Sequence, residues 1–263
     1  MKILTAEAKE SFDRLMAGKF LATQNQEGKV NVVPVITMKP FDSETLVFGE
    51  MMVRKTKRNL EEDGKVSACV VTDRLESYRV RGKFKGFENR GKHHDKITNI
   101  DMIKYTPYGS VRSAGIIKVD KIETPLNLGL LNVIPSEMST RFLQFISENT
   151  TEKKEKMHPN VMEKFGESMG IKVVASNRND FPEVIPVLSM KALNPNTLIF
   201  SSIGSPGLSK LEEGEFVASS VLTMEPCSYQ VKGIFEGFEG KIGKIRVKEV
   251  YSNSPPRPGE KIS

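Results

Sequence analysis

Short apolar and β-branched runs, separated by polar turns, make up much of the chain and predict a mainly β protein. Residues 20–25 and 30–38 form two such runs on either side of a polar turn at 26–28, a pairing that predicts a β-hairpin. Residues 45–48 and 66–71 are again rich in β-branched and large apolar side chains, which predicts two further strands. We therefore expect an antiparallel sheet in the first part of the chain.

The segment before these strands has the spacing of a helix. Residues 5–18 begin with Thr5, a preferred N-cap, and end with Gly18, a preferred stop. The apolar side chains between them recur at intervals of three and four, which predicts an amphipathic helix. Its apolar face consists of Ala8, Phe12, Leu15 and Met16.

The same series of segments occurs twice in the chain. Four segments of the first half return in the same order in the second half, shifted by 151 or 152 residues. A nearly constant offset over four ordered matches predicts two tandem copies of one β-rich unit. The matches are PVITMK at 34–39 with PVLSMK at 186–191, TLVF at 45–48 with TLIF at 197–200, LEEDGKV at 60–66 with LEEGEFV at 211–217, and SYRVRGKFKGFE at 77–88 with SYQVKGIFEGFE at 228–239.

We assign residues 1–125 to the first copy, 155–263 to the second copy, and 126–154 to a helical connector and linker. The second copy also begins with a helix-like segment, residues 159–169, which starts with a proline. In the connector, Pro135 and Ser136 are expected to introduce a helix. The apolar stripe of that helix would comprise Met138, Phe142, Leu143, Phe145 and Ile146.

The two copies differ between their last two strands. The first copy carries an excursion at residues 89–112, whereas the second copy closes the same connection within residues 240–243. Adjacent histidines in the excursion point in different directions on a helix or a strand, so they cannot easily share one metal ion. We therefore expect a surface excursion and no metal site. Its histidines and tyrosines are His93, His94, Tyr105 and Tyr108.

A cationic run that also carries a hydroxyl group lies between the strands predicted at 45–48 and 66–71. It reads Arg54-Lys55-Thr56-Lys57-Arg58, and we expect a short helix to open after it, at Asn59. Cations neutralise a phosphate, a hydroxyl donates to it, and the backbone N–H groups at a helix start point toward it. The run therefore predicts a phosphate site, with a solvated charged turn as the alternative. Arg79 and Arg81 alternate along a later strand, and we expect them on the solvent face of the sheet.

Charge and composition narrow the class of partner. The chain has 39 Lys and Arg against 33 Asp and Glu, a net charge of +6 spread along its length, so a phosphate-bearing small ligand accounts for the excess and nucleic acid is not required. Charged residues interrupt the first 20 residues and no long apolar segment follows, so we expect no signal peptide, no membrane span and a cytoplasmic protein. The two cysteines, Cys69 and Cys227, are expected to be buried free thiols.

The order of these segments resembles the pyridoxamine 5′-phosphate oxidase-like family of FMN-binding split β-barrels. The resemblance rests on LATQNQEGKVNVVPV at 21–35, TLVFGEMMVRKTKRNLEEDGKVSACV at 45–70 and SYRVRGKFKGFE at 77–88. It implies a mainly β fold with accessory helices, in which two tandem six-stranded antiparallel split β-barrels pack as an internal pseudo-dimer.

The resemblance also implies that FMN binds at the interface of the two barrels. Its phosphate would lie at the basic run, and its isoalloxazine ring would lie along the second strand. Asn59 is included in the site, with capping of the helix as its alternative role. The implied cofactor-binding residues are Arg54, Lys55, Thr56 and Asn59 at the phosphate, and Val33, Pro34 and Val35 beside the ring.

The second copy lacks the cations of the basic run. It reads Gly-Ser-Pro-Gly-Leu-Ser-Lys at residues 204–210, where the first copy has residues 53–59. Each lost charge-assisted hydrogen bond is worth about 1.5–3 kcal/mol. We therefore expect one good flavin site per chain, built on the first copy and walled by the second.

The implied function is that of an FMN-dependent oxidoreductase, either a reductase or an oxidase of a small molecule, in which the flavin carries the chemistry. No side chain is singled out as a catalytic acid or base, and the substrate and the electron donor or acceptor stay open. The same fold could hold the deazaflavin F420 or haem in place of FMN. A non-enzymatic flavin or electron carrier and a flavin-free interaction module are further alternatives. The sequence also leaves open a homodimer of the pseudo-dimeric chain.

Overall fold

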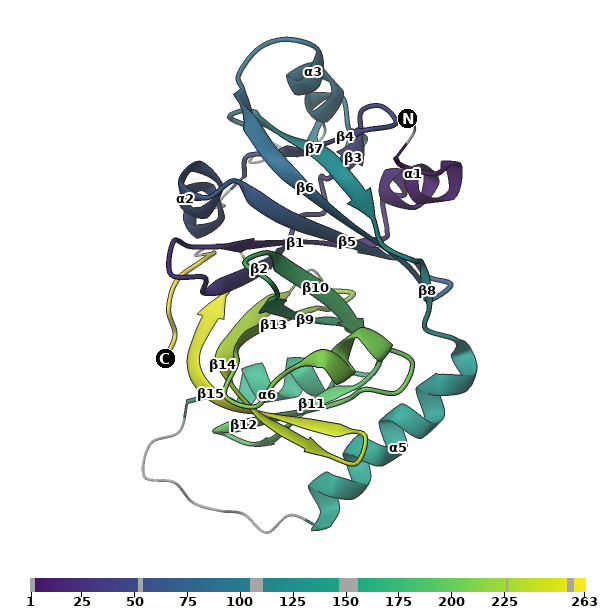
Figure 1. The fold of residues 1–263 in the computed structure, drawn as a ribbon, viewed down its shortest axis with the longest axis vertical. Coiled ribbons are helices and arrows are strands. Elements are labelled where there is room, and N and C mark those ends of the chain that lie inside the picture. The colour runs from purple at the N-terminus through teal and green to yellow at the C-terminus, as the bar shows by residue number, and fades with distance from the viewer. Residues whose placement is uncertain (1–2, 52–53, 105–110, 147–155, 226, 255–257) are drawn as a thin grey trace.

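The chain folds into two antiparallel β-sheets, one from each half of the sequence, stacked on one another (Figure 1). None of the helices in the described part of the chain is long and apolar enough to cross a membrane. The computed structural model describes residues 3–51, 54–104, 111–146, 156–225, 227–254 and 258–263.

The first sheet, which we call the first barrel, has the strand order β2-β1-β5-β6-β7-β4-β3, with the short β8 paired to β6. Its strands are β1 (Gly18–Gln24), β2 (Val30–Pro34), β3 (Lys39–Pro40), β4 (Thr45–Gly49), β5 (Lys65–Val71), β6 (Glu76–Glu88), β7 (Ala114–Ile122) and β8 (Leu126–Asn127).

The second sheet, the second barrel, has the order β10-β9-β13-β14-β15-β12-β11, which is the first order repeated. The register repeats as well, since Phe20 lies opposite Pro34 and Val173 lies opposite Pro186. The predicted duplication is therefore confirmed in the strand order and pairing. The strands are β9 (Ile171–Asn177), β10 (Pro182–Val187), β11 (Met190–Asn194), β12 (Thr197–Ser201), β13 (Phe216–Leu222), β14 (Ser228–Glu239) and β15 (Ile242–Ser252).

Each sheet is closed into a split barrel by one bent segment of chain. β2 and β3 lie at opposite edges of the first sheet, although only residues 35–38 separate them in sequence. β10 and β11 close the second sheet in the same way. Pro34 ends β2, and the chain turns directly after it, where the Met38 N–H donates to the Val35 carbonyl at 3.1 Å. The run predicted as one strand at 30–38 is thus a broken strand, and counting β2 with β3 as one gives six strands on the closed path.

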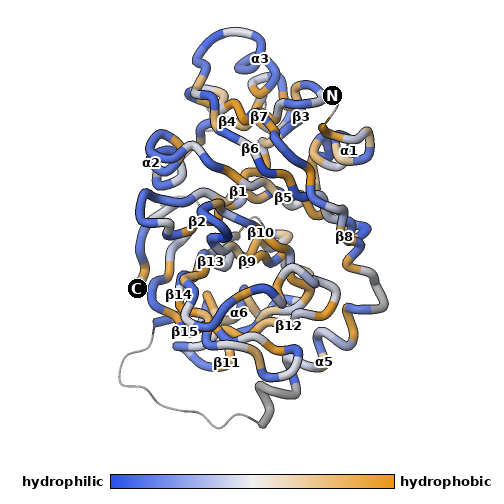
Figure 2. Tube along the Cα trace, in the orientation of Figure 1, coloured by the Kyte–Doolittle hydropathy of each residue, from blue (hydrophilic) through white to orange (hydrophobic). Residues whose placement is uncertain are grey.

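Alternation along β1 divides its side chains between two apolar cores. Leu21 packs inside the first barrel, whereas Phe20 and Ala22 pack in the contact between the barrels. All seven residues of β1 are therefore buried, as expected for a strand that is covered on both faces. Figure 2 shows hydrophobic segments on the strands of both barrels and on those that meet between them.

The two barrels contact each other through equivalent strands. β2 of the first barrel packs on β13 of the second, and β10 of the second packs on β5 of the first. Hydrogen bonds join them, because Ser67 Oγ donates to the Pro182 carbonyl at 2.5 Å and the Gln230 amide donates to the Val32 carbonyl. The chain is an internal pseudo-dimer.

Helices cover the outside of the barrels. α1 contacts β3 and α6 contacts β11, so the helix that precedes each copy docks in the same place. α5 runs along one side of the second barrel (Figure 1). The helices are α1 (Ala6–Asp13), α2 (Arg54–Glu62), α3 (Lys92–Thr98), α4 (Asp101–Lys104), α5 (Leu130–Ile146), α6 (Pro159–Gly166) and the 3₁₀ helix η1 (Pro206–Lys210).

The first helix is shorter than predicted. Thr5 caps it, since its Oγ1 accepts from the Ala8 N–H at 3.2 Å, but the helix ends at Asp13 and Gly18 is already the first residue of β1. Leu15 and Met16 are 48% and 84% exposed. Their assignment to the apolar face was wrong, because the chain turns into β1 before they could pack.

The connector helix begins earlier than predicted. α5 starts at Leu130 and contains Pro135, so the prediction that Pro135 introduces the helix was wrong. The start is set by a turn, in which Asn127 Oδ1 accepts from the Gly129 N–H at 3.0 Å and Gly129 has a φ of 69°. Met138 is 65% exposed. The side chains of Phe142, Leu143, Phe145 and Ile146 lie outside the described residues.

The excursion of the first copy adds a small apolar core. Ile97, Ile100 and Ile103 pack with Val47 of β4, so α3 and α4 are docked elements and the expectation of a surface excursion was incomplete. His93 Nδ1 lies 2.7 Å from Glu88 Oε2. Tyr105 and Tyr108 lie outside the described residues. Both cysteines are free thiols, Cys69 buried and Cys227 only partly buried.

Candidate functional site

The basic run lies on α2, at the edge of the contact between the barrels. α2 begins at Arg54, so the prediction that a helix opens only at Asn59 was wrong. Lys and Arg are good helix formers, and no glycine or proline interrupts the chain before Gly64, which has a φ of 75°. Asn59 is therefore an interior residue of the helix and does not cap it. Figure 2 shows α2 as a hydrophilic segment.

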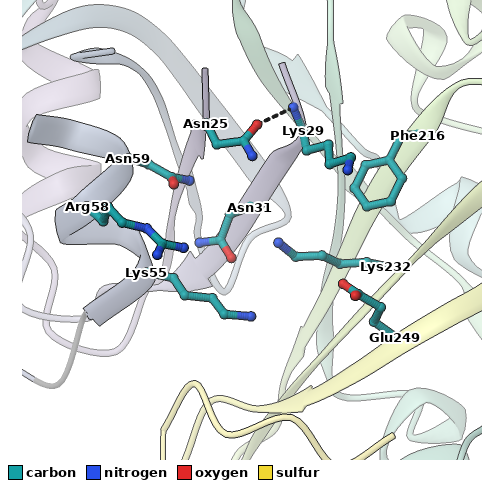
Figure 3. Close-up of a pocket in the computed structure, with 9 residues that line it drawn as sticks. All are labelled: Asn25, Lys29, Asn31, Lys55, Arg58, Asn59, Phe216, Lys232 and Glu249. Atoms are coloured by element: carbon teal, nitrogen blue, oxygen red, sulfur yellow. Dashed lines mark hydrogen bonds between the residues drawn. The ribbon is translucent and has the colours of Figure 1, made fainter. Parts of the chain in front are cut away.

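A cavity of about 140 Å³ lies between α2 and the second barrel (Figure 3). The first barrel contributes α2 and the β1–β2 hairpin, and the second contributes β13, β14 and β15. The cavity is smaller than the roughly 300–1,000 Å³ of pockets that enclose a drug-sized ligand, so its size suits a small anion or one end of a larger molecule. The lining residues are Asn25, Lys29, Asn31, Lys55, Arg58, Asn59, Phe216, Lys232 and Glu249.

Two buried amide–hydroxyl hydrogen bonds fix α2 to the strands beneath it. Asn31 Nδ2 donates to Thr56 Oγ1 at 3.2 Å, and Asn59 Nδ2 donates to Thr23 Oγ1 at 3.1 Å. All four residues are buried, so these bonds are shielded from competition by water. They hold the face of α2 that carries Lys55 against the cavity.

Lys55 from the first barrel and Lys232 from the second converge on the cavity (Figure 3). Burial lowers the pKa of Lys55, and burial, reinforced by the charge of Lys55, lowers the pKa of Lys232 to about 8. Neither ammonium forms an ion pair or a hydrogen bond with any residue that the structure describes. Two like charges are thus partly desolvated at one cavity, which is unfavourable. The charge of Glu249 offsets this in part, because it acts to raise the pKa of both lysines.

The carboxylate in the cavity wall, that of Glu249, already has two partners. Glu249 accepts from the Tyr251 hydroxyl at 2.9 Å and pairs with Lys261 at 3.2 Å. Burial acts to raise the pKa of Glu249, but these two partners outweigh it and the pKa is lowered. The ring of Tyr251 lies beneath both lysines, with its centroid 3.2 Å from Lys55 Nζ and 5.6 Å from Lys232 Nζ. This cation–π contact orients the ammonium groups without neutralising them.

Only some of the residues predicted at the phosphate line the cavity. Lys55 and Asn59 line the cavity, together with Arg58. Thr56 is 1% exposed and does not line it, because its hydroxyl accepts from Asn31. The side chain of Arg54 lies outside what the structure describes.

The residues predicted beside the flavin ring do not line the cavity. The side chain of Val35 belongs to the interior core of the first barrel, and Val33 packs against the same core. Pro34 is partly exposed at the end of β2. The structure therefore brings Lys55 and Asn59 of α2 together at the cavity. Val33 and Pro34 lie farther along β2, the strand that carries Asn31, and Val35 follows directly after it.

Arg79 and Arg81 do not lie on a solvent face, as the alternation along β6 had predicted. Glu183 of the second barrel pairs with Arg81 at 3.3 Å and with Arg79 at 3.8 Å. The prediction was wrong because it treated the first barrel alone, whereas the second barrel covers that face of β6.

Reasoning from the sequence missed the residues that the second barrel contributes, above all Lys232 and Tyr251. Each lies in a strand that mixes apolar with polar and charged residues, so a single lysine or tyrosine there carries no signal of its own. The signal that could have found Lys232 is the repeat, because it aligns with Arg81 of the first copy.

A scan against protein-family models finds no match to the chain, and a search of the curated proteins finds none either. Several solved structures are similar in fold. HupZ of Group A Streptococcus is 24% identical, with a TM-score of 0.39, and the match covers 46% of this chain and 92% of HupZ.

An FMN-binding protein from Syntrophomonas wolfei is 21% identical over 45% of this chain and 82% of its own, with a TM-score of 0.38. A candidate pyridoxamine 5′-phosphate oxidase from Lactobacillus delbrueckii is 17% identical over 47% of this chain and 96% of its own, with a TM-score of 0.39. Each of these matches covers a little under half of this chain.

Proposed function

We propose that this chain is a flavoprotein that binds one FMN at the contact between its two barrels, with the FMN phosphate in the cavity between Lys55 and Lys232. The proposal includes a role in oxidation or reduction of a small molecule. Its main support is a pair of ammonium groups, one from each barrel, that form no ion pair or hydrogen bond with a described residue; Lys232 is buried and Lys55 is half-buried.

The residues present fit a phosphate monoester. Such a group carries a charge of about −1.5 to −2 near neutral pH, which would neutralise both ammonium groups. Arg58 adds a further cation to the wall, and its only ion pair among the described residues is with Glu62 at 3.9 Å. The cavity volume suits the phosphate end of FMN, so we assign only that end.

Each residue has a part that follows from its position. Lys55 and Lys232 would bind and orient the phosphate, and the Asn31–Thr56 bond would keep α2 at the correct distance. Tyr251 would hold the two ammonium groups in place, and its hydroxyl donates to the Glu249 carboxylate. The flavin, when bound, would supply the hydride or electron transfer.

A comparison of FMN with riboflavin tests this proposal. The two ligands share the ring and differ in the phosphate, so the difference in their dissociation constants isolates its contribution. Two charge-assisted hydrogen bonds of about 1.5–3 kcal/mol each predict that FMN binds at least a hundredfold more tightly in a fluorescence-quenching titration. Equal affinities would contradict the proposed phosphate site, and tight binding of F420 but not FMN would keep the anion site and change the cofactor.

A further inference from the structure

In the second copy, a carboxylate of the protein lies at the strand position that corresponds to the cavity wall of the first copy. Asn31, in the cavity wall, lies opposite Thr23 and three residues before Pro34. Glu183 lies opposite Ser176 and three residues before Pro186. The pseudo-twofold relation between the barrels therefore places Glu183 where the first site has Asn31.

One pair of cations corresponds between the two positions. Lys232 of β14 corresponds to Arg81 of β6, because each is the fifth residue of the matched segments SYQVK and SYRVR. The helix lysine of the first site, Lys55, corresponds to Pro206 of η1, which carries no charge. The second position has thus lost a cation on its helix and gained a carboxylate on its edge strand.

Three guanidinium groups surround the Glu183 carboxylate. Oε1 lies 3.3 Å from Arg81 Nη2 and 3.8 Å from Arg79 Nη1, and Oε2 lies 3.3 Å from Arg178 Nη1. Glu183 is 8% exposed. Arg79 Nη1 also lies 3.6 Å from the position of a Cβ added to Gly207, so it reaches the turn that corresponds to the basic run. This is an anion bound by cations of both barrels, and the anion belongs to the protein.

We propose that Glu183 is a built-in counter-anion that closes the second phosphate position, so that each chain takes up one ligand phosphate. The proposal rests on the function proposed above for the first position. It predicts that removing the charge of Glu183 opens an anion site formed by Arg79, Arg81 and Arg178.

The substitution Glu183→Gln keeps the side-chain length and removes the charge, and the full chain is titrated with inorganic phosphate and with FMN. We expect at least tenfold tighter binding of phosphate than in the wild type and a second equivalent of FMN per chain. Arg81 also pairs with Glu123 at 3.1 Å, but Arg79 and Arg178 lose the Glu183 carboxylate, and cations left without it destabilise a buried site. Thermal unfolding of Glu183→Gln and Glu183→Asn is therefore also followed in phosphate and in chloride at equal ionic strength. Phosphate should restore the lost melting temperature and chloride should not.

The matched variant Asn31→Glu introduces the same carboxylate at the first position. It should pair with Lys55 and Lys232 and weaken FMN binding at least tenfold, which would make the first position resemble the second.

The outcomes separate the two proposals. If the wild type binds one FMN and Glu183→Gln gains neither a second equivalent nor a specific stabilisation by phosphate, the role of Glu183 is refuted and the proposed function stands. If Glu183→Gln gains phosphate binding while the wild type binds no FMN, the counter-anion is supported and the flavin function is refuted.

Discussion

Replacing Lys232 with methionine distinguishes two roles for this lysine, binding of a ligand and stabilisation of the fold. Lys232 is 8% exposed and lies on β14 of the second barrel, opposite Lys55 across the cavity. Methionine retains most of the apolar stem and removes the ammonium. The substitution should raise the stability of the ligand-free protein and weaken FMN binding, whereas loss of a structural ion pair would lower stability.

The magnitudes follow from the environment of Lys232. Burial lowers its pKa from 10.5 to about 8, and each unit of such a shift corresponds to about 1.4 kcal/mol. Holding the charged form at pH 7 therefore costs on the order of 3 kcal/mol, which Lys232→Met would return to the ligand-free protein. Loss of a charge-assisted hydrogen bond to the phosphate, about 1.5–3 kcal/mol, should weaken FMN binding by roughly tenfold to a hundredfold.

Urea unfolding of the ligand-free protein and fluorescence titration with FMN measure the two effects. Lys19→Met is the matched control, because Lys19 is fully buried on β1 with a pKa also lowered to about 8 by burial, yet it does not line the cavity. The control should gain stability and keep its FMN affinity. The reasoning is refuted if Lys232→Met keeps wild-type affinity, or if both variants lose affinity equally.

Three further predictions concern pH and packing. FMN affinity should fall by up to tenfold per pH unit as the pH rises through about 8, because the free protein then loses the charge on Lys232. In calorimetric titrations, Lys232→Arg should flatten this pH profile. A wild-type profile that is already flat from pH 7 to 9.5 would contradict the assignment. Burial lowers the pKa of Lys19 in the folded protein from its ordinary 10.5 to about 8, so the unfolded chain binds more protons between these values. The free energy of unfolding should therefore rise with pH from about 8 to 10.5. Urea titrations should show a smaller slope for Lys19→Met, and an equal slope would exclude Lys19 as a cause. A Cβ on Gly115 would lie 2.3 Å from the Phe48 ring, so Gly115→Ala should destabilise the protein by about 1–3 kcal/mol in urea unfolding, and adding Phe48→Leu should recover part of the loss if the clash is the reason.

The repeat made the fold predictable, because two copies of one strand pattern must give two sheets of the same order. The residues at which the prediction failed are those whose environment comes from tertiary contacts. Leu15 and Met16 have helical spacing, yet α1 ends before them. Proline is common in the first turn of a helix, yet α5 begins before Pro135, at Leu130, directly after the Asn127–Gly129 turn.

Of the residues that line the cavity, those of the first barrel were easier to predict than those of the second. The basic run identified Lys55, since a cluster of cations next to a strand can be read in the sequence. Lys232 and Tyr251 could not be found in that way, because they reach the cavity only when the second barrel is docked. Thr56 was predicted at the phosphate because its hydroxyl suits one, but that hydroxyl accepts from Asn31 and does not line the cavity.

A crystal structure of the chain with FMN tests the central claim most directly, because it shows where the phosphate binds. The account predicts one FMN per chain, with phosphate oxygens about 2.7–3.2 Å from the Nζ atoms of Lys55 and Lys232 and the ion pairs of Glu183 intact. A phosphate bound between Arg79 and Arg178, or one with no contact to either lysine, would contradict it.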